Sequence, residues 1–341
     1  MQSLHMLQSA MEPFQVHCVY FCFLVMLQSL QHIRHNIAAA TEARMKLDER
    51  FKATLMLDQW DRLTLTECEE VARDLEKELP APFRFHLVET CALGEQSHQV
   101  AFFEWAGPPQ GYDHAFFALI PGGEPTLGYD RDHPFVPSQQ QKESWINETE
   151  KAFDYTLEVF LDMVMTPLRY ITIQPFLLEV LETPLSPPPV FNETLGPSGG
   201  WEHHPAPISY RKTLVRLSNN GFRFPTSDEW EYACAAGSRT LFRWGNTTPP
   251  FSIPLLGGKK VSGWDLHLRQ NAFGLFIARN PYHWEFCTER EIMRGGDGGN
   301  TLHAGAGTFA AWLTLASAFH QKVDDERDRY GVYLRRAFSL T

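Results

Sequence analysis

The sequence has little cysteine: six residues in 341, scattered along the chain, with no Cys-x-x-Cys pair. This absence excludes a zinc ribbon and a thioredoxin-type motif, which both need thiols at close spacing. Spacings this loose in a chain of this length are typical of reduced thiols, so we expect a cytoplasmic protein. Three Asn-x-Thr sequons begin at Asn147, Asn192 and Asn246, and they would matter only in a secreted chain.

An excess of positive charge is also lacking. Lys and Arg together number 30 and Asp and Glu number 41, which gives a net charge of −11. A nucleic-acid-binding surface needs clustered basic residues, so we expect no nucleic-acid partner. The hydrophobic content of 43% is that of a globular protein and excludes general disorder.

The N-terminal apolar run, Val16–Leu27, does not reach the length of a membrane-spanning helix. Such a helix needs roughly 20 apolar residues. The run also lacks the basic start and the small-residue cleavage site of a signal peptide. We therefore expect no membrane span, although this run leaves membrane association open.

The chain divides into three predicted parts. Residues 1–59 form an N-terminal helical extension, which is either partly disordered or the product of an over-extended start. Residues 60–114 form a small α+β module packed on the core. Residues 115–341 form the main domain, so the predicted fold class is α+β.

Local patterns predict the elements of these parts. Thr66 and Glu69 predict a capping box for a helix that Pro80 ends. Alternating apolar residues then predict antiparallel strands over 83–87, 100–105 and 115–120. Further on we expect a helix over 142–164, a strand over 169–181 interrupted at Pro175, and a long loop over 182–207 rich in proline and glycine.

The stretch from residue 221 to 246 reads GFRFPTSDEWEYACAAGSRTLFRWGN. Thr226 and Glu229 predict a second capping box, Trp230 faces inward, and Gly237 stands where a left-handed residue ends the helix. With its Arg-Phe-Pro entry and its Trp-Gly-Asn exit, this segment resembles the sulfatase-modifying-factor domain, also called the formylglycine-generating-enzyme-like domain.

Other landmarks of that family follow in the family's order. They are LIPGGEPTLG at 119–128, RYITIQPFLLE at 169–179, NAFGL at 271–275, WEF at 284–286, MRGG at 293–296 and YGVYL at 330–334. The resemblance covers the chain from about residue 115 to about residue 338. It implies a C-type-lectin-like fold with little regular secondary structure and with long loops held by aromatic side chains.

The activity that the resemblance implies is the oxidation of a substrate cysteine to formylglycine, at a copper ion held by two thiolates. In the family these two cysteines follow the RGGS motif. Here Asp297 stands at the serine position, Asn300 and Gly305 stand near the cysteine positions, and no cysteine follows Cys287. We therefore expect neither copper nor formylglycine generation.

A second catalytic branch of the same superfamily uses non-haem iron held by three histidines. This sequence has no His-x-x-x-His pair, and its N-terminus offers only His32 and His35. A histidine-based site would have to draw on His303 together with His283, His203 or His204. A metal-dependent oxidoreductase of this kind is the alternative to a binding role.

Calcium is a further trait that the family implies, bound by oxygen ligands in the loop around the WEW motif. The corresponding loop here is RNPYHWE at 279–285, with one extra residue and a proline. Asn280 and Glu285 are the candidate calcium ligands. The alternative is that Glu285 caps a loop while Trp284 fills the core.

The glycine-rich segment, RGGDGGNTLHAGAG at 294–307, is the sharpest local feature, because glycine lets a backbone approach a ligand closely. The residues that we expect to bind a ligand are Arg294, Asp297, Asn300, His303 and Trp312. Asp297 and His303 would form an acid/base pair if the segment folded back on itself. Alternatively, the glycines only make tight turns and let the following helix, 309–319, pack closely.

These observations predict a divergent formylglycine-generating-enzyme-like protein that has lost the copper chemistry. Because such a fold holds variable loops on a rigid frame, it can bind without catalysing a reaction. We expect it to be a scaffold for a peptide, protein or small-molecule ligand, bound over the glycine-rich segment.

Overall fold

The computed structural model describes residues 47–107, 115–185, 190–192, 200–202, 209–251, 253, 263–323 and 332–340. His32, His35, His203 and His204 lie outside these residues, as does most of the predicted N-terminal extension. The protein combines helices with antiparallel sheets, which confirms the predicted α+β class. In the described part, no helix is both long and apolar enough to cross a membrane.

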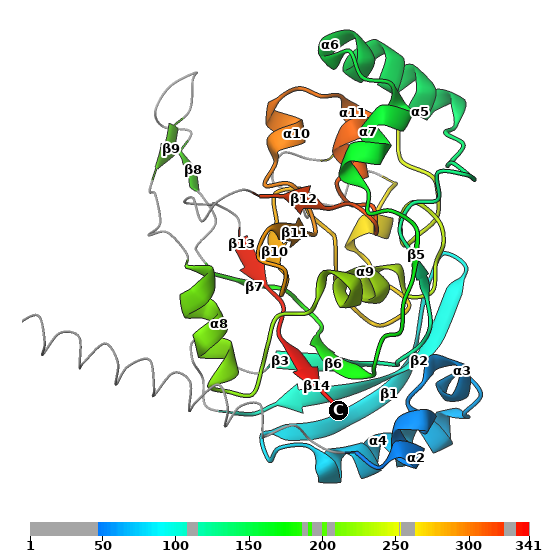
Figure 1. Ribbon diagram of the computed structural model, residues 1–341, viewed down its shortest axis with the longest axis vertical. Helices are drawn as coiled ribbons and strands as arrows, with labels where there is room; N and C mark the ends of the chain where they lie inside the picture. The colour runs from blue at the N-terminus through cyan, green and yellow to red at the C-terminus, as the bar shows by residue number, and fades with distance from the viewer. Residues whose placement is uncertain are drawn as a thin grey trace, which may run out of the picture.

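A five-stranded antiparallel sheet carries the lower half of the molecule in Figure 1, in the order β1-β2-β3-β6-β14. Its strands are β1 (Phe83–Leu93), β2 (Gln96–Trp105), β3 (Ala115–Ile120), β6 (Phe176–Glu179) and β14 (Ala337–Ser339). The predicted meander is confirmed, and its first two strands are longer than predicted. Because β3 pairs with β6, the predicted small module and the main domain share one sheet.

Both faces of this sheet are buried at its middle strands, whereas β1 exposes part of one face. Phe103, Phe117 and Leu177 enter one hydrophobic cluster, and their neighbours Phe102, Ala118 and Leu178 enter the other. Successive side chains of a strand point to opposite faces, so a strand covered on both sides reads as a continuous apolar run. This explains the runs AFF at 101–103 in β2 and FALI at 117–120 in β3.

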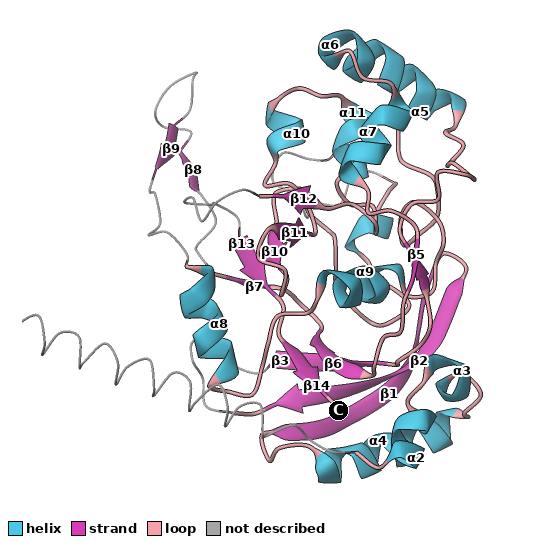
Figure 2. Ribbon diagram, in the orientation of Figure 1, coloured by secondary structure: helices cyan, strands magenta, loops and turns pink. Residues whose placement is uncertain are grey.

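Short strands make up a second, mixed sheet in the order β12-β11-β10-β13-β7 (Figure 2). They are β12 (Gln321–Lys322), β11 (Ile292–Arg294), β10 (Trp284–Phe286), β13 (Val332–Leu334) and β7 (Thr183–Pro184). Two further pairs are β4 (Thr126–Leu127) with β5 (Arg169–Tyr170), and β8 (Val190–Asn192) with β9 (Gly200–Glu202). The predicted strand over 169–181 is thus split into β5 and β6, with Pro175 between them.

Two arginines join the two sheets. The chain passes from β13 to β14 through Arg335 and Arg336 alone. The Arg335 guanidinium pairs with Glu285 of β10 at 2.9 Å and with Glu182 at 3.1 Å. Arg336 pairs with Glu179 of β6 at 2.8 Å. All five side chains are at least nine-tenths buried, so the two sheets are connected by a buried network of ion pairs.

Helices α2 (Glu49–Thr54), α3 (Leu57–Trp60) and α4 (Leu65–Glu78) lie beside β1 and β2 (Figure 1). The predicted capping box of α4 is wrong by two residues. Thr64 is the N-cap, and its hydroxyl and main chain exchange hydrogen bonds with Glu67. Two overlapping Thr-x-x-Glu boxes occur here, and the earlier one adds helical residues to the start of α4.

The predicted single helix over 142–164 is also wrong. The segment forms α5 (Gln139–Ser144), a π-helix (Trp145–Glu150), α6 (Lys151–Phe153) and, after a turn, α7 (Leu157–Val164). The turn has Asp154 in the left-handed region, φ +57°, and the Thr156 hydroxyl caps α7. Ile146 and Phe153, which the single helix would have buried, are exposed.

Helices α8 (Tyr210–Ser218) and α9 (Ser227–Ala235) belong to the central part of the chain. The predicted capping box of α9 is confirmed: the Thr226 hydroxyl accepts from the amide of Glu229, and Trp230 is fully buried. The left-handed position that ends α9 falls on Ala236, φ +47°, and Gly237 continues it at φ +84°.

Three indole rings pack together beyond α9, and one of them contacts a buried cation. Trp244, Trp264 and Trp312 have ring centroids 6.3 to 6.4 Å apart. The Arg243 guanidinium lies 4.8 Å from the Trp244 ring and donates to the carbonyls of Ala278 and His267. Among the described residues it makes no ion pair, and burial lowers its pKa to about 10. The face of the Trp244 indole and two main-chain carbonyls therefore stabilise the Arg243 charge, where a carboxylate would be the usual partner.

Substitution of the two threonines tests the start of α4. Thr64→Ala should lower the free energy of unfolding by about 1 kcal/mol, because it removes the observed cap. Thr66→Ala is the matched control and should change it by less than about 0.5 kcal/mol. Urea denaturation of both variants measures this, and a larger loss for Thr66→Ala would mean that the helix starts at the later box.

His267 makes stability depend on pH. Its ring is fully buried against Trp312, neither ring nitrogen has a partner among the described residues, and burial lowers its pKa to about 4. The unfolded ring takes up a proton near pH 6.5, so the unfolded state binds more protons between about pH 6.5 and 4. The free energy of unfolding should therefore decrease as the pH is lowered from about 6.5 to about 4.

His267→Phe keeps the ring contact and removes the titration. We expect a shallower loss of the free energy of unfolding between about pH 6.5 and 4, with a remainder from His320, whose pKa is also lowered to about 4 by burial. Denaturation at a series of pH values measures this. An unchanged slope would show that His267 is protonated in the folded protein.

Candidate functional site

The glycine-rich segment begins inside the core. Arg294, at the end of β11, is fully buried and pairs with Glu231 of α9 at 2.8 Å. It also donates to the hydroxyl of Ser227 and to the carbonyl of Phe319. Its hydrogen-bonding groups are thus directed at the protein itself, and Arg294 joins the second sheet to α9.

Asp297 closes a turn within the same segment. Its carboxylate accepts hydrogen bonds from the amides of Gly299 and Thr301 and from the Thr301 hydroxyl. Burial raises its pKa, although these hydrogen bonds act in the opposite direction. Asn300 is exposed at the start of α10 (Asn300–His303), and the side chain of His303 lies outside the described part, so the predicted acid/base pair stays a prediction.

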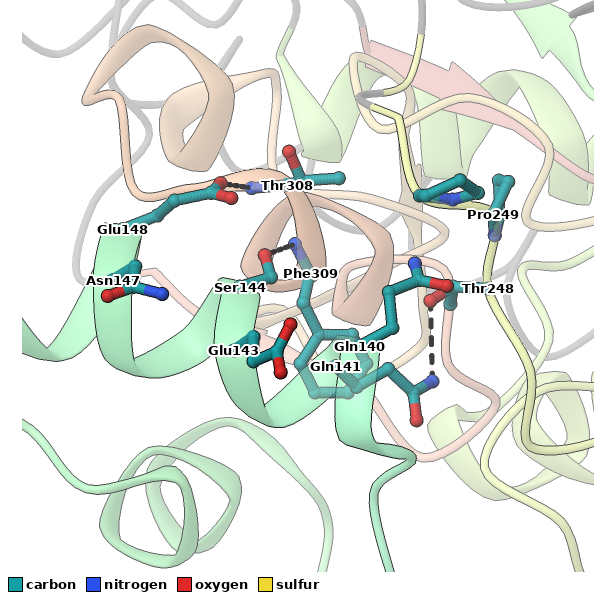
Figure 3. Close-up of a pocket in the computed structure, with 11 residues that line it drawn as sticks. Gln140, Gln141, Glu143, Ser144, Asn147, Glu148, Thr248, Pro249, Thr308 and Phe309 are labelled. Carbon is teal, nitrogen blue, oxygen red and sulfur yellow. Dashed lines mark hydrogen bonds between the residues drawn. The ribbon is translucent and has the colours of Figure 1, made fainter.

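The end of the glycine-rich segment is fixed to α5 and the π-helix (Figure 3). Glu148 and Ser144 accept from the amides of Thr308 and Phe309, the first residues of α11 (Thr308–Leu313), at 2.5 and 3.2 Å. Gly307 has φ +99°, and a Cβ there would lie 2.7 Å from that of Glu148. Glycine is therefore required for this close approach, as the packing alternative predicts.

Helix α11 is shorter than the predicted 309–319. It carries Trp312, which is fully buried and donates to the carbonyl of Phe251. A small polar cavity of about 230 Å³ lies where α11 meets α5 and the π-helix (Figure 3). Gln141, one of its lining residues, donates to the Thr248 hydroxyl and to the carbonyl of Asn246, so part of this lining also holds the fold together.

The candidate calcium ligands have other partners. Both carboxylate oxygens of Glu285 accept from Arg335, and one also accepts from the Trp230 indole at 2.9 Å. The Asn280 side chain accepts from the amide of Tyr282 and lies 2.9 Å from Nε2 of His283. These residues do not present free oxygens to a hard cation, so their arrangement does not fit a calcium site.

The histidines of the alternative reading are only partly described. Nδ1 of His283 lies 3.0 Å from Glu182, its Nε2 contacts Asn280, and its ring stacks on Tyr333 at 3.8 Å. Burial acts to raise the pKa of Glu182, but the hydrogen bond with His283 and the charges of Arg335 and Arg279 lower it to about 2. Within the described ranges, no group of three or more His, Cys, Asp or Glu side chains is placed to hold a metal ion.

A cavity of about 760 Å³ lies at the C-terminal end of α9, which is within the usual size of a small-molecule site. Three parts of the chain form its walls: α3 with the residues around it, the turn from Gly123 to Leu127, and the residues that end and follow α9. The lining is Met56, Leu57, Asp58, Asp61, Gly123, Glu124, Pro125, Thr126, Leu127, Tyr232, Ala235, Gly237, Ser238 and Arg239.

Tyr232 lines this cavity and has a buried hydroxyl. Its side chain is 2% exposed, and its hydroxyl has no hydrogen-bonding partner among the described residues. A Cβ built on Gly123, across the cavity lining, would lie 3.3 Å from that hydroxyl. Burial, with the negative charge of Asp61, raises the pKa of Tyr232, so the hydroxyl is protonated and can donate. A buried hydroxyl without a partner costs free energy.

Asp61 is held in place by His98. The ring Nδ1 of His98 lies 3.0 Å from both carboxylate oxygens of Asp61, and its Nε2 lies 3.2 Å from the carbonyl of Ala236. Both ring nitrogens of His98 thus face oxygen atoms. His98 is buried in β2 while Asp61 is 37% exposed, so the pair anchors the carboxylate at the rim of the cavity.

A second cavity, of about 350 Å³, adjoins the first. Leu127, Ala235, Ser238 and Arg239 line both of them. Glu231 lines the second one and, through Arg294, connects it to the core. The C-terminal end of α9 is therefore the wall between two neighbouring cavities.

Sequence reasoning found neither cavity. Tyr232 and Arg239 belong to the stretch that carries the family resemblance, but an aromatic residue inside a helix indicates core packing. Asp58 and Asp61 lie in a charged helix whose pattern indicates only a solvated surface. A tyrosine hydroxyl in an otherwise apolar helix face was the one available signal.

Comparison with known proteins adds little. No protein-family model matches the sequence, and no curated protein matches it. Among solved structures, that of PvdO from Pseudomonas aeruginosa is similar with 14% sequence identity and a TM-score of 0.36, over 65% of this chain and 93% of that chain. A similarity at this level assigns no activity to the present chain.

Substitution of Glu285 separates an ion-pair role from a calcium role. Glu285→Gln should lower the free energy of unfolding by about 3–5 kcal/mol, because it leaves the Arg335 charge buried and under-compensated. Glu291→Gln, at an exposed position one strand away, should change it by less than about 0.5 kcal/mol. Chemical denaturation measures both variants.

The same proteins are then heated in calcium and in chelator. We expect equal melting temperatures for the wild-type protein in the two solutions, because Arg335 and Trp230 already satisfy Glu285. A melting temperature raised by calcium in the wild type and not in Glu285→Gln would restore the calcium assignment.

Proposed function

We propose that the chain is a divergent formylglycine-generating-enzyme-like protein that binds a small molecule in the cavity beside Tyr232, and that it does not generate formylglycine. The observation that carries the binding role is the cavity of about 760 Å³, whose lining includes Tyr232, a residue whose buried hydroxyl has no partner among the described residues. The resident groups around it are rigid, because α9 is capped at one end and packed along its length.

The family assignment is supported by the positions of the motif residues. Trp230 of the first motif donates to Glu285 of the WEF motif, and Arg294 of the MRGG motif pairs with Glu231. Asn271 of NAFGL is buried and donates to the carbonyls at the end of α9. Residues far apart in the sequence therefore meet around one helix, which is consistent with a common framework.

The thiols support the absence of copper chemistry. Cys234 and Cys287, the cysteines nearest to the glycine-rich segment in sequence, are fully buried, and burial raises both pKa values, that of Cys234 to about 11. Copper needs thiolates as soft ligands, and these groups are held as thiols. The positions near the family's cysteines carry Asn300 and Gly305 instead.

The glycine-rich segment supports the scaffold. Arg294 and Asp297 use their polar atoms on the segment itself, on α9 and on the carbonyl of Phe319, while Trp312 is buried. We therefore place the ligand at the C-terminal end of α9 rather than over this segment. A ligand over the glycine-rich segment stays a prediction that depends on His303.

Occupation of the cavity can be tested with a neutral probe. 2-Phenylethanol combines an apolar body with one hydroxyl, which matches the Tyr232 site. We expect saturable binding to the wild-type protein in ligand-observed NMR, because the lining provides apolar contact and one free donor. Leu57→Trp places a large ring in the cavity and should abolish binding.

Gln140→Trp is the matched control, since it makes the same kind of change in the polar cavity of Figure 3. It should bind the probe as the wild type does. Absence of saturable binding, or equal binding by the Leu57→Trp variant, would disprove the proposed site.

A further inference from the structure

The cavity of about 760 Å³ has an acidic lining. Asp58, Asp61 and Glu124 contribute carboxylates, and Arg239 contributes the one guanidinium among the residues that line it. The carboxylates come from two parts of the chain, α3 with its C-terminal end and the turn from Gly123 to Leu127. Three carboxylates and one guanidinium give this lining a formal charge of −2.

Arg239 does not cancel the charge of these acids. Its Nη1 donates to the carbonyl of Thr126 at 2.7 Å and its Nη2 to that of Gly128 at 3.2 Å. Within the described ranges it makes no ion pair with a lining carboxylate. Glu124 is close in sequence to Thr126, so its charge can be set against that of Arg239. The lining then still has the excess charge of the two aspartates.

Both aspartates are accessible to a ligand. Asp58 is exposed, and its carboxylate accepts from the neutral amide of Gln59 at 2.8 Å. Asp61 is 37% exposed, and both of its oxygens lie 3.0 Å from Nδ1 of His98, which fixes the orientation of this carboxylate. A carboxylate has about four lone-pair sites, so each aspartate can accept a further donor.

The remaining lining favours a ligand with an apolar body and a positive charge. Leu57, Pro125 and Leu127 contribute apolar side chains. Ala235, the last residue of α9, also lines the cavity, and the last carbonyls of a helix carry partial negative charge. Carboxylates in a cleft with apolar walls raise the local concentration of cations.

We propose that this cavity selects an organic cation, a primary ammonium ion carried by an apolar body. The selectivity rests on the proposed function, to which it adds the charge of the ligand. It comes from the excess of carboxylates over the whole lining, so it does not depend on where in the cavity the ammonium group lies. A carboxylate ligand of the same size would be repelled.

Three compounds with the same phenylethyl body differ in charge. They are the cation phenethylamine, the neutral 2-phenylethanol and the anion 3-phenylpropionate. We expect phenethylamine to bind at least about threefold more tightly than 2-phenylethanol, and 3-phenylpropionate to bind more weakly than both, since one solvent-exposed ion pair changes a binding constant by up to about fivefold. Ligand-observed NMR titration measures the dissociation constants at low and high salt. Salt should reduce the preference for the amine, because it screens exposed charges.

Substitution of the acids tests the source of this preference. Asp58→Asn/Glu124→Gln removes two carboxylates and keeps their shapes, so the ratio of the 2-phenylethanol to the phenethylamine dissociation constant should fall toward one. Each single variant should lower the ratio in part. Asp132→Asn/Glu291→Gln makes the same two changes at exposed positions outside the cavity lining, and it should keep the wild-type ratio. Melting temperatures show whether the variants are folded.

The outcomes distinguish the selectivity from the proposed function. Equal binding of phenethylamine and 2-phenylethanol to the wild type would overturn the selectivity for a cation and leave a small-molecule site. A wild-type ratio in the folded Asp58→Asn/Glu124→Gln variant, or tightest binding of 3-phenylpropionate, would also overturn it. Failure of all three compounds to bind would overturn the site itself.

Discussion

The fold depends on one buried network of charges. Arg335 sits between the two sheets with no exposure to solvent, and it donates to Glu285, to Glu182 and to three main-chain carbonyls. A buried charge of this kind is strongly destabilising when it loses its partner. Elements that carry those partners, β10, β6 and the segment before β7, are therefore fixed relative to each other. Around them the chain has few long elements, so side chains set much of its architecture.

Helix α9 connects this network to other parts of the molecule. At its N-terminal half, Glu231 holds Arg294 and Arg169, and Trp230 holds Glu285. Its C-terminal end forms the wall of both cavities. In the segment that carries the family resemblance, the first part of α9 makes buried ion pairs and hydrogen bonds. The residues at its C-terminal end and just after it line the two cavities. This division explains how a framework can persist while its chemistry changes.

Local patterns in the sequence predicted local structure. The meander β1-β2-β3 and the cap of α9 depend on residues close together in the chain, and both are confirmed. The helix over 142–164 was wrong because apolar spacing does not reveal a left-handed residue such as Asp154. The roles of Arg294 and Glu285 could not be predicted, since their partners Glu231 and Arg335 lie 63 and 50 positions away. Tyr232 was missed because burial without a partner has no signature in sequence.

The two-residue connection between β13 and β14 has an evolutionary consequence. Arg335 faces the carboxylates of one sheet and Arg336 the carboxylate of the other, so each position has a fixed partner. One inserted or deleted residue would present each guanidinium to the wrong side and leave buried acids without a cation. Insertions and deletions among related sequences should therefore be found in the other loops. The length of this connection should stay constant.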